Sequence, residues 1–337
     1  MTVLTLSGGL ALDLGTTNTL IYRKGGGLVV NEPSLAALET KSRRVLAVGR
    51  EAKEYLGRTP KGLEVVRPLK GGLISDFPAA LEMIRRFLDQ AGAGRRFFRP
   101  KIVLSAPSKA TRLEKRALIE AAEQAGGKTV HLVNKPLAAA LGLGLDITEP
   151  APQLVLDVGG GAAEGVIISL GATAFSECRA TAGDEATLAV IHYLRRKFSL
   201  TVGENMAERI KMTIGSALPL SEEEPFPCRG KETLTGIPRE MRLTREDLVE
   251  ALAGVAGEFA DLVKLLLSQV PPDIAADLGQ SGLNLTGGGS LLAGLDQRLT
   301  LETGLEVHYP KDPLLSVILG LGEILENFHH YKPIFIN

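Results

Sequence analysis

Apolar and polar positions alternate along the chain with two different periods, and this alternation predicts an α/β fold. Short apolar runs bounded by turn residues predict buried strands at Lys101–Ala106 and Thr129–Val133. Between them, Lys109–Gln124 repeats apolar residues at helical spacing and ends at a glycine pair, which is typical of a helix. Pro136–Leu141 predicts a second helix, made of small residues. Strands that alternate with helices indicate an α/β sheet.

Two segments, one in each half of the chain, share a further pattern. Each has an apolar strand that ends in an aspartate, a glycine-rich reversal and a second apolar strand. The aspartate is Asp13 in the first segment and Asp157 in the second. Two unrelated hairpins would share some of this pattern, but the glycine two positions after each aspartate favours a duplication. The repeat therefore predicts two similar domains that face each other across a cleft.

Two regions interrupt the alternation of strands and helices and are predicted to be insertions. Residues 33–74 mix strand, short helix and several turns, whereas residues 182–245 hold two predicted helices, 184–198 and 203–217, before a polar, proline-rich stretch. The predicted division is a first core domain at 1–32, 75–145 and 312–337 with an inserted subdomain at 33–74, and a second core domain at 146–181 and 246–311 with an inserted subdomain at 182–245.

Two features of this division concern the ends of the first core domain. The segment after Asp312 is apolar, so it is expected to form a helix that needs a partner surface and closes the first domain. The boundary near Asp146–Pro152 has no low-complexity linker, which favours a hinge over a flexible tether.

Composition narrows the classes of function. The 337 residues suffice for two domains, and 38 lysines and arginines against 39 aspartates and glutamates leave a net charge of −1. A nearly neutral chain has no bulk attraction to nucleic acid, so no nucleic-acid partner is expected. Cys178 and Cys228 are too few for a disulfide framework and lack metal-ligand spacing, which favours a reducing cytoplasm.

No segment of the chain is predicted to cross a membrane. The sequence contains no apolar run of about 18 residues, the length that a transmembrane helix needs. The N-terminal stretch has no basic region and reaches a glycine turn too early for a signal peptide. It is expected to form a first strand, because its apolar residues are too sparse for an amphipathic anchor; these are Val3, Leu4, Leu6, Leu10 and Leu12.

Three glycine-rich turns are candidate phosphate or nucleotide contacts. Asp13–Thr19 and Asp157–Gly161 each place backbone amides at a tight reversal, where glycine permits close approach of a phosphate oxygen. An aspartate at such a strand end suits the waters around a phosphate-bound Mg²⁺. Leu283–Leu292 predicts a strand, a triple-glycine turn and a helix capped by Ser290, whose start suits a nucleotide. Each turn alone also fits an ordinary connection, but together they favour a nucleotide site.

Other polar residues carry less information by themselves. Glu204, Glu208 and Lys211 share one face of the predicted helix 203–217, which alone indicates a solvated charged face. The histidines lack metal-ligand spacing, and His131 and His192 are expected to be structural. The C-terminal stretch FHHYKPIFIN either caps the core or contacts a neighbouring molecule.

In this order along the chain, the features resemble the MreB-like bacterial actins of the actin and sugar-kinase superfamily. The resemblance runs from about Leu10 to Asn327 and rests on the stretches DLGTTNTLIY, NEPS, VGREAKEYLGRTP, RPLKGGLISDF, LTGGGSLLAGLDQRL and ETGLEV followed by KDPL. It implies the actin-like, ribonuclease H-like duplicated two-domain fold, with a central nucleotide cleft and two smaller inserted subdomains. It also implies ATP or ADP with Mg²⁺ as ligands, and self-association into filaments, with paired protofilaments as one form of assembly.

The resemblance assigns roles to individual residues. Phosphate contacts are implied for Gly15, Thr16, Thr17 and Asn18 from one side and for Gly159, Gly160 and Gly161 from the other. Asp13 and Asp157 are implied to hold Mg²⁺ through water. Contacts with the adenosine part are implied for Glu208, Lys211, Gly287, Gly288 and Gly289.

Three positions depart from the family pattern where hydrolysis would occur. The family usually has glutamate where this chain has Lys135, and two threonines where it has Ala162 and Ala163. Losing that carboxylate and those hydroxyls removes groups that would position and activate a water. These degenerate catalytic positions predict that ATP hydrolysis is weak or absent, so whether the chain is an enzyme is left open.

A short loop suggests contact with a membrane. Two phenylalanines, Phe97 and Phe98, stand among three arginines, Arg95, Arg96 and Arg99, in a chain poor in aromatic residues. Exposed apolar residues flanked by basic ones suit an anionic lipid surface, and similar proteins carry a membrane-inserting loop at the corresponding place. The alternative is that one phenylalanine packs inward and the arginines are solvated.

These observations favour a filament-forming, ATP-binding cytoskeletal protein of the cell-shape type. Its expected location is the cytoplasm, at the inner face of the plasma membrane, with cell-wall or shape-complex proteins as further expected partners. A non-polymerising pseudo-ATPase that regulates a bacterial actin filament is the first alternative. A small-molecule kinase of the same superfamily is another, but Lys135 stands where such an enzyme needs a carboxylate.

Overall fold

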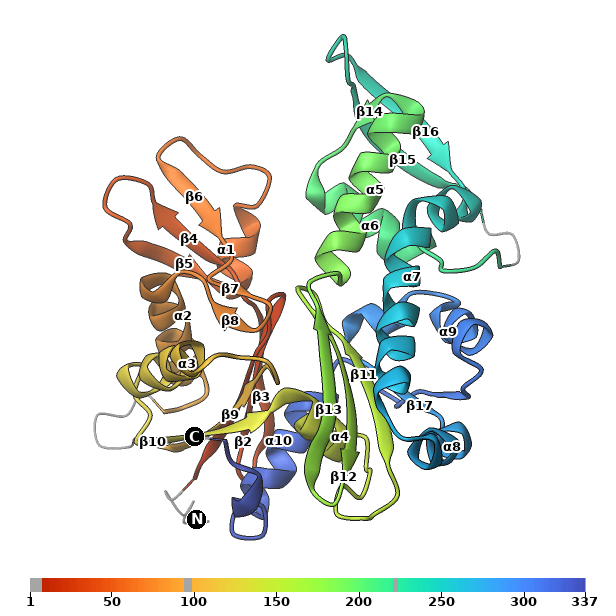
Figure 1. The fold of residues 1–337 in the computed structure, drawn as a ribbon. Helices are drawn as coiled ribbons and strands as arrows, with labels where there is room; N and C mark the ends of the chain where they lie inside the picture. The colour runs from red at the N-terminus through yellow and green to blue at the C-terminus, as the bar shows by residue number, and fades with distance from the viewer. Residues whose placement is uncertain (1–7, 94–98, 221–223, 337) are drawn as a thin grey trace. The chain divides into compact units, whose positions relative to one another are not determined.

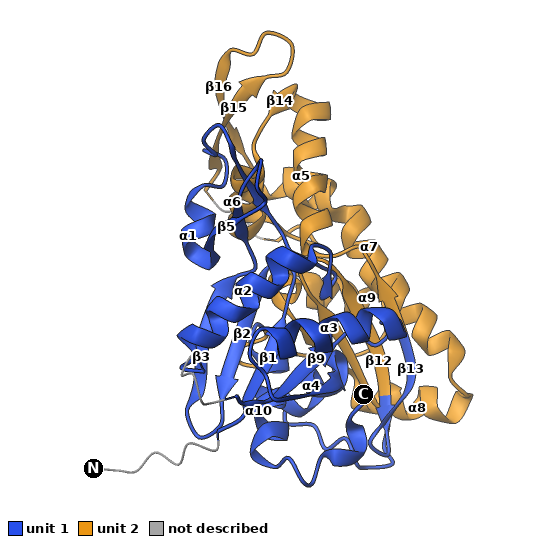
Figure 2. Ribbon diagram, turned by 90° about the vertical axis from the view of Figure 1, so that its left-hand side faces the viewer, with its two compact units in different colours: residues 1–151, 168–176, 314–337 blue, residues 152–167, 177–313 orange. Residues whose placement is uncertain are grey.

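A computed structural model describes residues 8–93, 99–220 and 224–336 (Figure 1). The chain folds into two compact units, coloured separately in Figure 2. Unit 1 holds Met1–Ala151, Ile168–Ser176 and Leu314–Asn337, and unit 2 holds Pro152–Ile167 and Glu177–Pro313.

Two five-stranded sheets repeat one topology, which confirms the predicted duplication. The first sheet has the order β10-β9-β1-β2-β3 and the second the order β13-β12-β11-β17-β18. In each sheet, three strands that follow one another in the chain lie side by side. Two later strands are added next to the first of these three, and both pair in parallel. Asp13 and Asp157 are the next-to-last residues of the equivalent strands β1 and β11.

The strand bounds are as follows. The first sheet contains β1 (Leu10–Leu14), β2 (Asn18–Arg23), β3 (Gly27–Pro33), β9 (Lys101–Ala106) and β10 (Thr129–Asn134). The second contains β11 (Gln153–Val158), β12 (Ala163–Ser169), β13 (Ala172–Arg179), β17 (Leu283–Thr286) and β18 (Val307–His308). The predicted strand at 101–106 is therefore confirmed, and the expected first strand begins at Leu10, while residues 1–7 lie outside the described part.

Helices cover both faces of the first sheet. On one face lie α2 (Phe77–Gln90) and α3 (Arg112–Gln124), and on the other lie α4 (Lys135–Gly142) and α10 (Ser316–Glu326). Leu10, Leu12 and Leu14 belong to the core shared with α2 and α3. Because side chains alternate across a strand, Asp13 lies on the opposite face of the sheet.

Three predicted helices are confirmed in this unit, with shifted ends. Helix α3 begins at Arg112 rather than Lys109, because the Thr111 side chain accepts a hydrogen bond from the Glu114 amide and the Glu114 side chain accepts one from the Thr111 amide. Helix α4 includes Lys135 and Gly142 at its ends. The apolar segment after Asp312 forms α10, which packs on α4, β1 and β2, as expected for a helix that closes the first domain.

Helices α4 and α10 approach each other through glycines. A methyl group on Gly142 would lie 1.8 Å from the Ser316 carbonyl oxygen, and one on Gly320 would lie 1.8 Å from the Ala138 carbonyl oxygen. Real Cβ atoms do not come that close to backbone, so glycine at both positions is a condition of this helix pair. The contact positions the first turn of α4, where Lys135 lies.

Smaller sheets lie in both inserted regions. In unit 1, β4 (Ala36–Glu39), β5 (Val45–Val48) and β6 (Leu63–Val66) form a sheet next to α1 (Gly49–Glu54), and β7 (Leu69–Lys70) pairs with β8 (Leu73–Ile74). In unit 2, α5 (Gly183–Phe198) and α6 (Glu204–Ile214) accompany a sheet of β14 (Leu200–Thr201), β15 (Phe226–Glu232) and β16 (Pro238–Leu243).

The β15–β16 hairpin was not anticipated in the polar, proline-rich stretch. It forms because one face is buried, through Cys228 and Leu243, while the other carries the cross-strand ion pair Arg229–Glu240 at 2.9 Å. The predicted helix 203–217 is also shorter than expected and ends at Ile214. Gly215 leaves the helical conformation, and a methyl group on it would lie 2.2 Å from the Lys211 carbonyl oxygen, so this helix end requires glycine.

The longest helix of the described ranges packs on the second sheet. Helix α7 (Arg245–Gln269) reaches β12 at Gly165, where an added methyl group would lie 2.5 Å from a Leu266 methyl carbon. Helices α8 (Pro272–Ser281) and α9 (Leu295–Thr303) complete the unit. Among the residues the structure describes, none of the helices has the length and apolar character of a membrane span.

The C-terminal stretch caps the first sheet. Phe335 pairs with Val133 as an antiparallel bridge, and the Ile336 amide donates to the Leu132 carbonyl oxygen at 3.0 Å, so the tail extends the edge strand β10. The rings of Phe328 and Phe335 each lie 5.0 Å from the His131 ring. Of the two expectations for this stretch, the structure bears out the cap.

The tail cluster predicts an acid-sensitive part of the stability. Burial lowers the pKa of His131, and the charge of Lys101 on β9 lowers it further. Between this lowered pKa and the ordinary value of about 6.5, the unfolded chain binds more protons than the folded one, so this contribution is complete above pH 6.5 and is lost as the pH falls.

The expected result is a melting temperature that falls between pH 7.5 and pH 5.5 by a larger amount in the wild type than in His131→Gln. His192→Gln, which changes an exposed histidine on α5, serves as the control and should follow the wild type. An identical pH response of wild type and His131→Gln would contradict this assignment.

Candidate functional site

The predicted site residues of unit 1 lie on the turn between β1 and β2. The Gly15 amide donates to the Asn18 carbonyl oxygen at 3.1 Å, and a methyl group on Gly15 would lie 2.6 Å from that oxygen, so the turn requires glycine. Thr16 is buried and its hydroxyl accepts a hydrogen bond from the Gly72 amide at 3.3 Å. Thr17 is exposed. The turn therefore has one threonine that anchors it and one that faces solvent.

Asp13, at the end of β1, is buried with an 8% exposed surface. The Ser105 hydroxyl on β9 donates a hydrogen bond of 2.7 Å to its Oδ1. Sequence reasoning did not find Ser105. The signal for it is the strand register, which becomes known only when β1 and β9 are seen to pair.

In unit 2, the loop after β11 is attached to the start of α5. The Gly159 amide donates to the Ala162 carbonyl oxygen at 2.9 Å and closes the loop. The carbonyl oxygens of Gly159 and Gly160 accept hydrogen bonds from the Gly183 and Asp184 amides, at 3.1 and 2.7 Å. These contacts hold the predicted phosphate loop in a defined shape.

Glu208 and Lys211 form a network on α6 rather than a solvated charged face. The Lys211 ammonium lies 2.6 Å from the Glu208 carboxylate and donates to the Gly183 carbonyl oxygen at 2.8 Å and to the Thr187 hydroxyl at 2.9 Å. Thr187 in turn donates to Glu208. The network joins α6 to the first turn of α5, next to the Gly159–Gly161 loop. Thr187 and Gly183 were missed because their roles depend on this packing.

The triple glycine after β17 lies against Asp157. Gly287 has a φ of +85°, and a methyl group on it would lie 2.4 Å from Asp157 Oδ1. A methyl group on Gly289 would lie 2.3 Å from a Val158 side-chain carbon. Because Asp157 is only 2% exposed, these glycines are what allows the two segments to pack so closely.

The predicted helix cap at Ser290 is wrong. Gly288–Leu291 form a short 3-10 helix in which the Ser290 hydroxyl donates to the Gly287 carbonyl oxygen at 2.7 Å. The α-helix that follows, α9, begins only at Leu295, after Gly294 with a φ of +69°. Ser290 therefore stabilises the glycine turn itself.

The three degenerate positions lie in different surroundings. Lys135 is the first residue of α4, immediately after β10 in unit 1. In unit 2, Ala163 is fully buried in β12 and Ala162 is half-buried before it. Glu164, which could replace the missing carboxylate, is 3% exposed on the same strand.

In each unit taken by itself, the residues present are of the kind that suits a magnesium ion held through water. Asp13 in unit 1 and Asp157 in unit 2 each offer carboxylate oxygens, the donors that Mg²⁺ prefers, and the turn that follows each aspartate offers backbone amides to phosphate. Within residues 8–93, 99–220 and 224–336, no three histidine, cysteine, aspartate or glutamate side chains gather into a metal cage.

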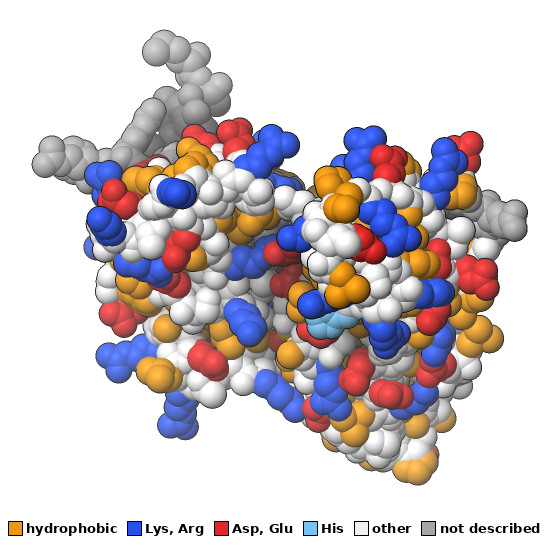
Figure 3. Space-filling model, turned by 90° about the horizontal axis from the view of Figure 1, so that it is seen from above, with side chains coloured by type: hydrophobic (Ala, Val, Ile, Leu, Met, Phe, Trp, Pro, Cys, Tyr) orange, Lys and Arg blue, Asp and Glu red, His pale blue; other side chains and the backbone are white. Residues whose placement is uncertain are grey.

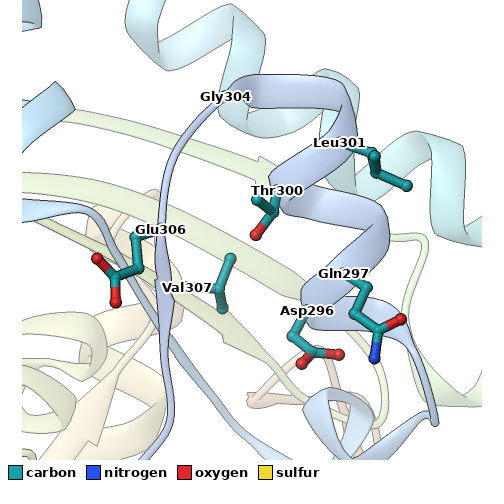
Figure 4. Close-up of a pocket in the computed structure, with 7 residues that line it drawn as sticks. All are labelled: Asp296, Gln297, Thr300, Leu301, Gly304, Glu306 and Val307. Carbon is teal, nitrogen blue, oxygen red and sulfur yellow. The ribbon is translucent and has the colours of Figure 1, made fainter.

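Other surface features lie apart from these groups. On the face drawn in Figure 3, basic and acidic side chains are intermixed, as expected at a net charge of −1. A pocket of about 610 Å³ lies between α9 and β18 (Figure 4). It is lined by Asp296, Gln297, Thr300, Leu301, Gly304, Glu306 and Val307, and none of the predicted site residues lines it.

Most of the predicted membrane loop lies outside the described residues. This applies to Arg95, Arg96, Phe97 and Phe98. Arg99 is described, and its guanidinium donates to the Gly127 carbonyl oxygen at 2.7 Å and to the Glu123 carbonyl oxygen at 3.2 Å, at the end of α3. Its contact with lipid stays a prediction.

Comparisons with known proteins cover nearly the whole chain. The sequence profile of the MreB/Mbl protein family matches residues 7–333. The chain is 41% identical over 326 residues to the cell shape-determining protein MreB of Escherichia coli strain K12, covering 95% of this chain and 94% of that protein. It is 38% identical over 318 residues to the cell shape-determining protein Mbl of Bacillus cereus, covering 94% and 96%.

A solved structure shares the fold. MreB5 of Spiroplasma citri bound to AMPPNP matches with a TM-score of 0.92 and 30% identity, covering 96% of this chain and 97% of that chain. The predicted actin-like fold of two duplicated α/β domains is thereby confirmed.

Proposed function

Because the chain belongs to the MreB/Mbl family, we propose that it is an ATP-binding, filament-forming cytoskeletal protein that helps to determine cell shape. The observation that carries the proposal is the continuous set of contacts in unit 2 that links the Gly159–Gly161 loop, the start of α5, Lys211 and Glu208. Structures of MreB5 of Spiroplasma citri bound to AMPPNP, an ATP analogue, and to ADP support ATP and ADP as the ligands. The proposed location is the cytoplasm.

Each group of residues has a proposed task in nucleotide binding. Backbone amides of the two glycine turns, together with Thr17 and Asn18, bind phosphate oxygens. Glu208 and Lys211 contact the ribose and adenine, and Gly287–Gly289 leave room for the adenosine. Mg²⁺, when bound, supplies positive charge that offsets the charge of the phosphates. Asp13 and Asp157 orient its waters.

Sedimentation tests the filament proposal. The protein at micromolar concentration is expected to pellet with ATP and to stay in solution without nucleotide, because the proposed assembly depends on nucleotide bound at the glycine turns. Asp157→Asn is expected to weaken both nucleotide binding and pelleting, whereas Asp273→Asn, on the first turn of α8, changes a charge elsewhere in unit 2 and should leave both unchanged.

Persistent monomers with ATP and lipid would contradict filament formation. If such monomers bound ATP and changed the pelleting of a hydrolysing relative, the better assignment would be a non-polymerising pseudo-ATPase that regulates a bacterial actin filament. ATP-dependent phosphorylation of a small molecule would instead support a kinase.

The proposed ATP turnover is weak. Lys135, Ala162 and Ala163 replace the carboxylate and hydroxyls that would activate and place a water, and loss of a general base alone typically costs about 10²–10⁴ in rate. The Lys135 ammonium is proposed to contact the terminal phosphate, where its charge partly replaces that of Mg²⁺. Nucleotide binding should then require less Mg²⁺ than in a hydrolysing relative.

Membrane association is proposed from the sequence of the loop at 95–99. Phe97 and Phe98 insert into the lipid while arginines contact headgroups, each worth about 1 kcal/mol near an anionic surface. Filaments add many such weak contacts, so binding should depend on assembly and on salt. Phe97→Ser with Phe98→Ser is expected to abolish pelleting with anionic liposomes while leaving the melting temperature unchanged. Pelleting that persists in this variant would place the contact elsewhere.

A further inference from the structure

We propose that Ser105 is a positioning residue for Asp13, which holds the Asp13 carboxylate in the orientation that Mg²⁺-dependent nucleotide binding needs. The inference rests on the proposed nucleotide function and adds a residue that the sequence did not single out. The Ser105 hydroxyl donates to Asp13 Oδ1 at 2.7 Å, and both residues are buried, Ser105 with 4% of its surface exposed.

The strand register places the two side chains together. Strands β1 and β9 pair in parallel with Ala11 opposite Val103 and Leu12 opposite Leu104. One further step along both strands brings Asp13 beside Ser105. Ile102, Leu104 and Ala106 belong to the core under α2 and α3. Ser105 therefore points to the other face of the sheet, the face of Asp13.

The chemistry of the pair explains why a hydroxyl is needed there. A buried carboxylate without hydrogen-bond donors loses much of its solvation, so a donor at 2.7 Å stabilises its ionised form. A bond to one oxygen also fixes the rotation of the carboxylate about its Cβ–Cγ bond, which determines where the other oxygen points. Removing an outer-shell partner of a metal site typically costs about 10–100-fold in metal affinity, and because Asp13 is proposed to hold Mg²⁺ through water, we expect the lower end of that range for Ser105.

The location of the pair agrees with this role. Asp13 and Ser105 lie near the carboxyl ends of neighbouring parallel strands, and Lys135 follows the carboxyl end of the next strand, β10. This is the edge at which ligands bind in open α/β sheets. Asp13 also lies directly before the turn that carries Gly15, Thr16 and Thr17. A carboxylate held in one orientation is therefore next to the turn that is proposed to bind phosphate.

The test measures the affinity for a fluorescent, slowly hydrolysed ATP analogue as a function of free Mg²⁺. Ser105→Ala is expected to raise the Mg²⁺ concentration of half-maximal effect about tenfold and to leave the affinity in EDTA unchanged. Ser105→Thr, which keeps the hydroxyl, should restore the wild-type value. Ser105→Cys keeps a side chain of similar size with a weaker hydrogen-bond donor, and its Mg²⁺ concentration of half-maximal effect should lie between those of wild type and Ser105→Ala. The threonine and cysteine variants therefore test the proposal even if the alanine variant folds poorly.

Ser216→Ala is the matched control. Ser216 is a buried serine in unit 2 whose hydroxyl donates to the Leu218 carbonyl oxygen at 2.6 Å, with the Ala293 carbonyl oxygen at 3.1 Å as a second acceptor, so both of these acceptors are carbonyl oxygens. An unchanged Mg²⁺ response in Ser105→Ala, or an equal shift in Ser216→Ala, would overturn the proposal.

Further outcomes separate this inference from the proposed function. If Asp13→Asn shifted the Mg²⁺ response and Ser105→Ala did not, the role of Ser105 would be overturned and that of Asp13 would stand. A wild-type affinity that ignores Mg²⁺ would also overturn it while leaving nucleotide binding intact. A wild type that binds no nucleotide would overturn both.

Discussion

Replacing Gly320 by alanine is expected to destabilise the protein by about 3 kcal/mol, at the upper end of the range for overpacking a core. The added methyl group would lie 1.8 Å from the Ala138 carbonyl oxygen and 2.8 Å from the Gly142 amide nitrogen. Both atoms belong to the backbone of α4, so no side chain can move aside. The helices must separate, and α10 would lose contact with α4 and the first sheet.

Denaturant unfolding of Gly320→Ala and Gly254→Ala measures this effect against a matched control. Gly254 lies within α7, is exposed, and has no heavy atom within 4 Å of an added methyl group. Gly254→Ala is therefore expected to stabilise the protein by about 0.8–1 kcal/mol through helix propensity. Equal changes in the two variants would show that the close approach of α4 and α10 is not needed.

Restoring the family residues is expected to raise ATP turnover by a factor of about 10² or more. The variant combines Lys135→Glu, Ala162→Thr and Ala163→Thr, which returns a carboxylate that can accept a proton and hydroxyls that can place a water. Phosphate release is measured in wild type and variant at saturating ATP. Because Ala163 is fully buried, the variant without Ala163→Thr should be measured as well.

Lys135→Gln is the control for this gain, because it removes the positive charge without adding a carboxylate. It is expected to stay as slow as the wild type and to bind nucleotide with a stronger Mg²⁺ requirement. Wild-type turnover as fast as that of hydrolysing relatives would refute the weak-hydrolysis proposal. Glu164, on β12, would then be the carboxylate to test.

Local patterns in the sequence were enough to predict much of the fold. The duplicated Asp-x-Gly hairpins, the strand at 101–106, the helix predicted at 109–124 apart from its first three residues, and the apolar C-terminal helix all follow from periodicity and glycine punctuation over short windows. Each of these features is set by residues that lie within a short stretch of the chain, so the sequence of that stretch is enough to predict it. The glycine turns were recognised for the same reason, since a turn's chemistry is local.

Only the tertiary structure decided which distant residues meet. Ser105 lies beside Asp13 because of the register between two strands that are far apart in the chain. The C-terminal stretch pairs with β10 because β10 is the edge strand of its sheet. The glycines of α4 and α10 matter because two helix backbones come into contact. The β15–β16 hairpin, hidden in a polar stretch, forms because Cys228 and Leu243 find a core. Each of these depends on packing between segments, which no short window of sequence contains.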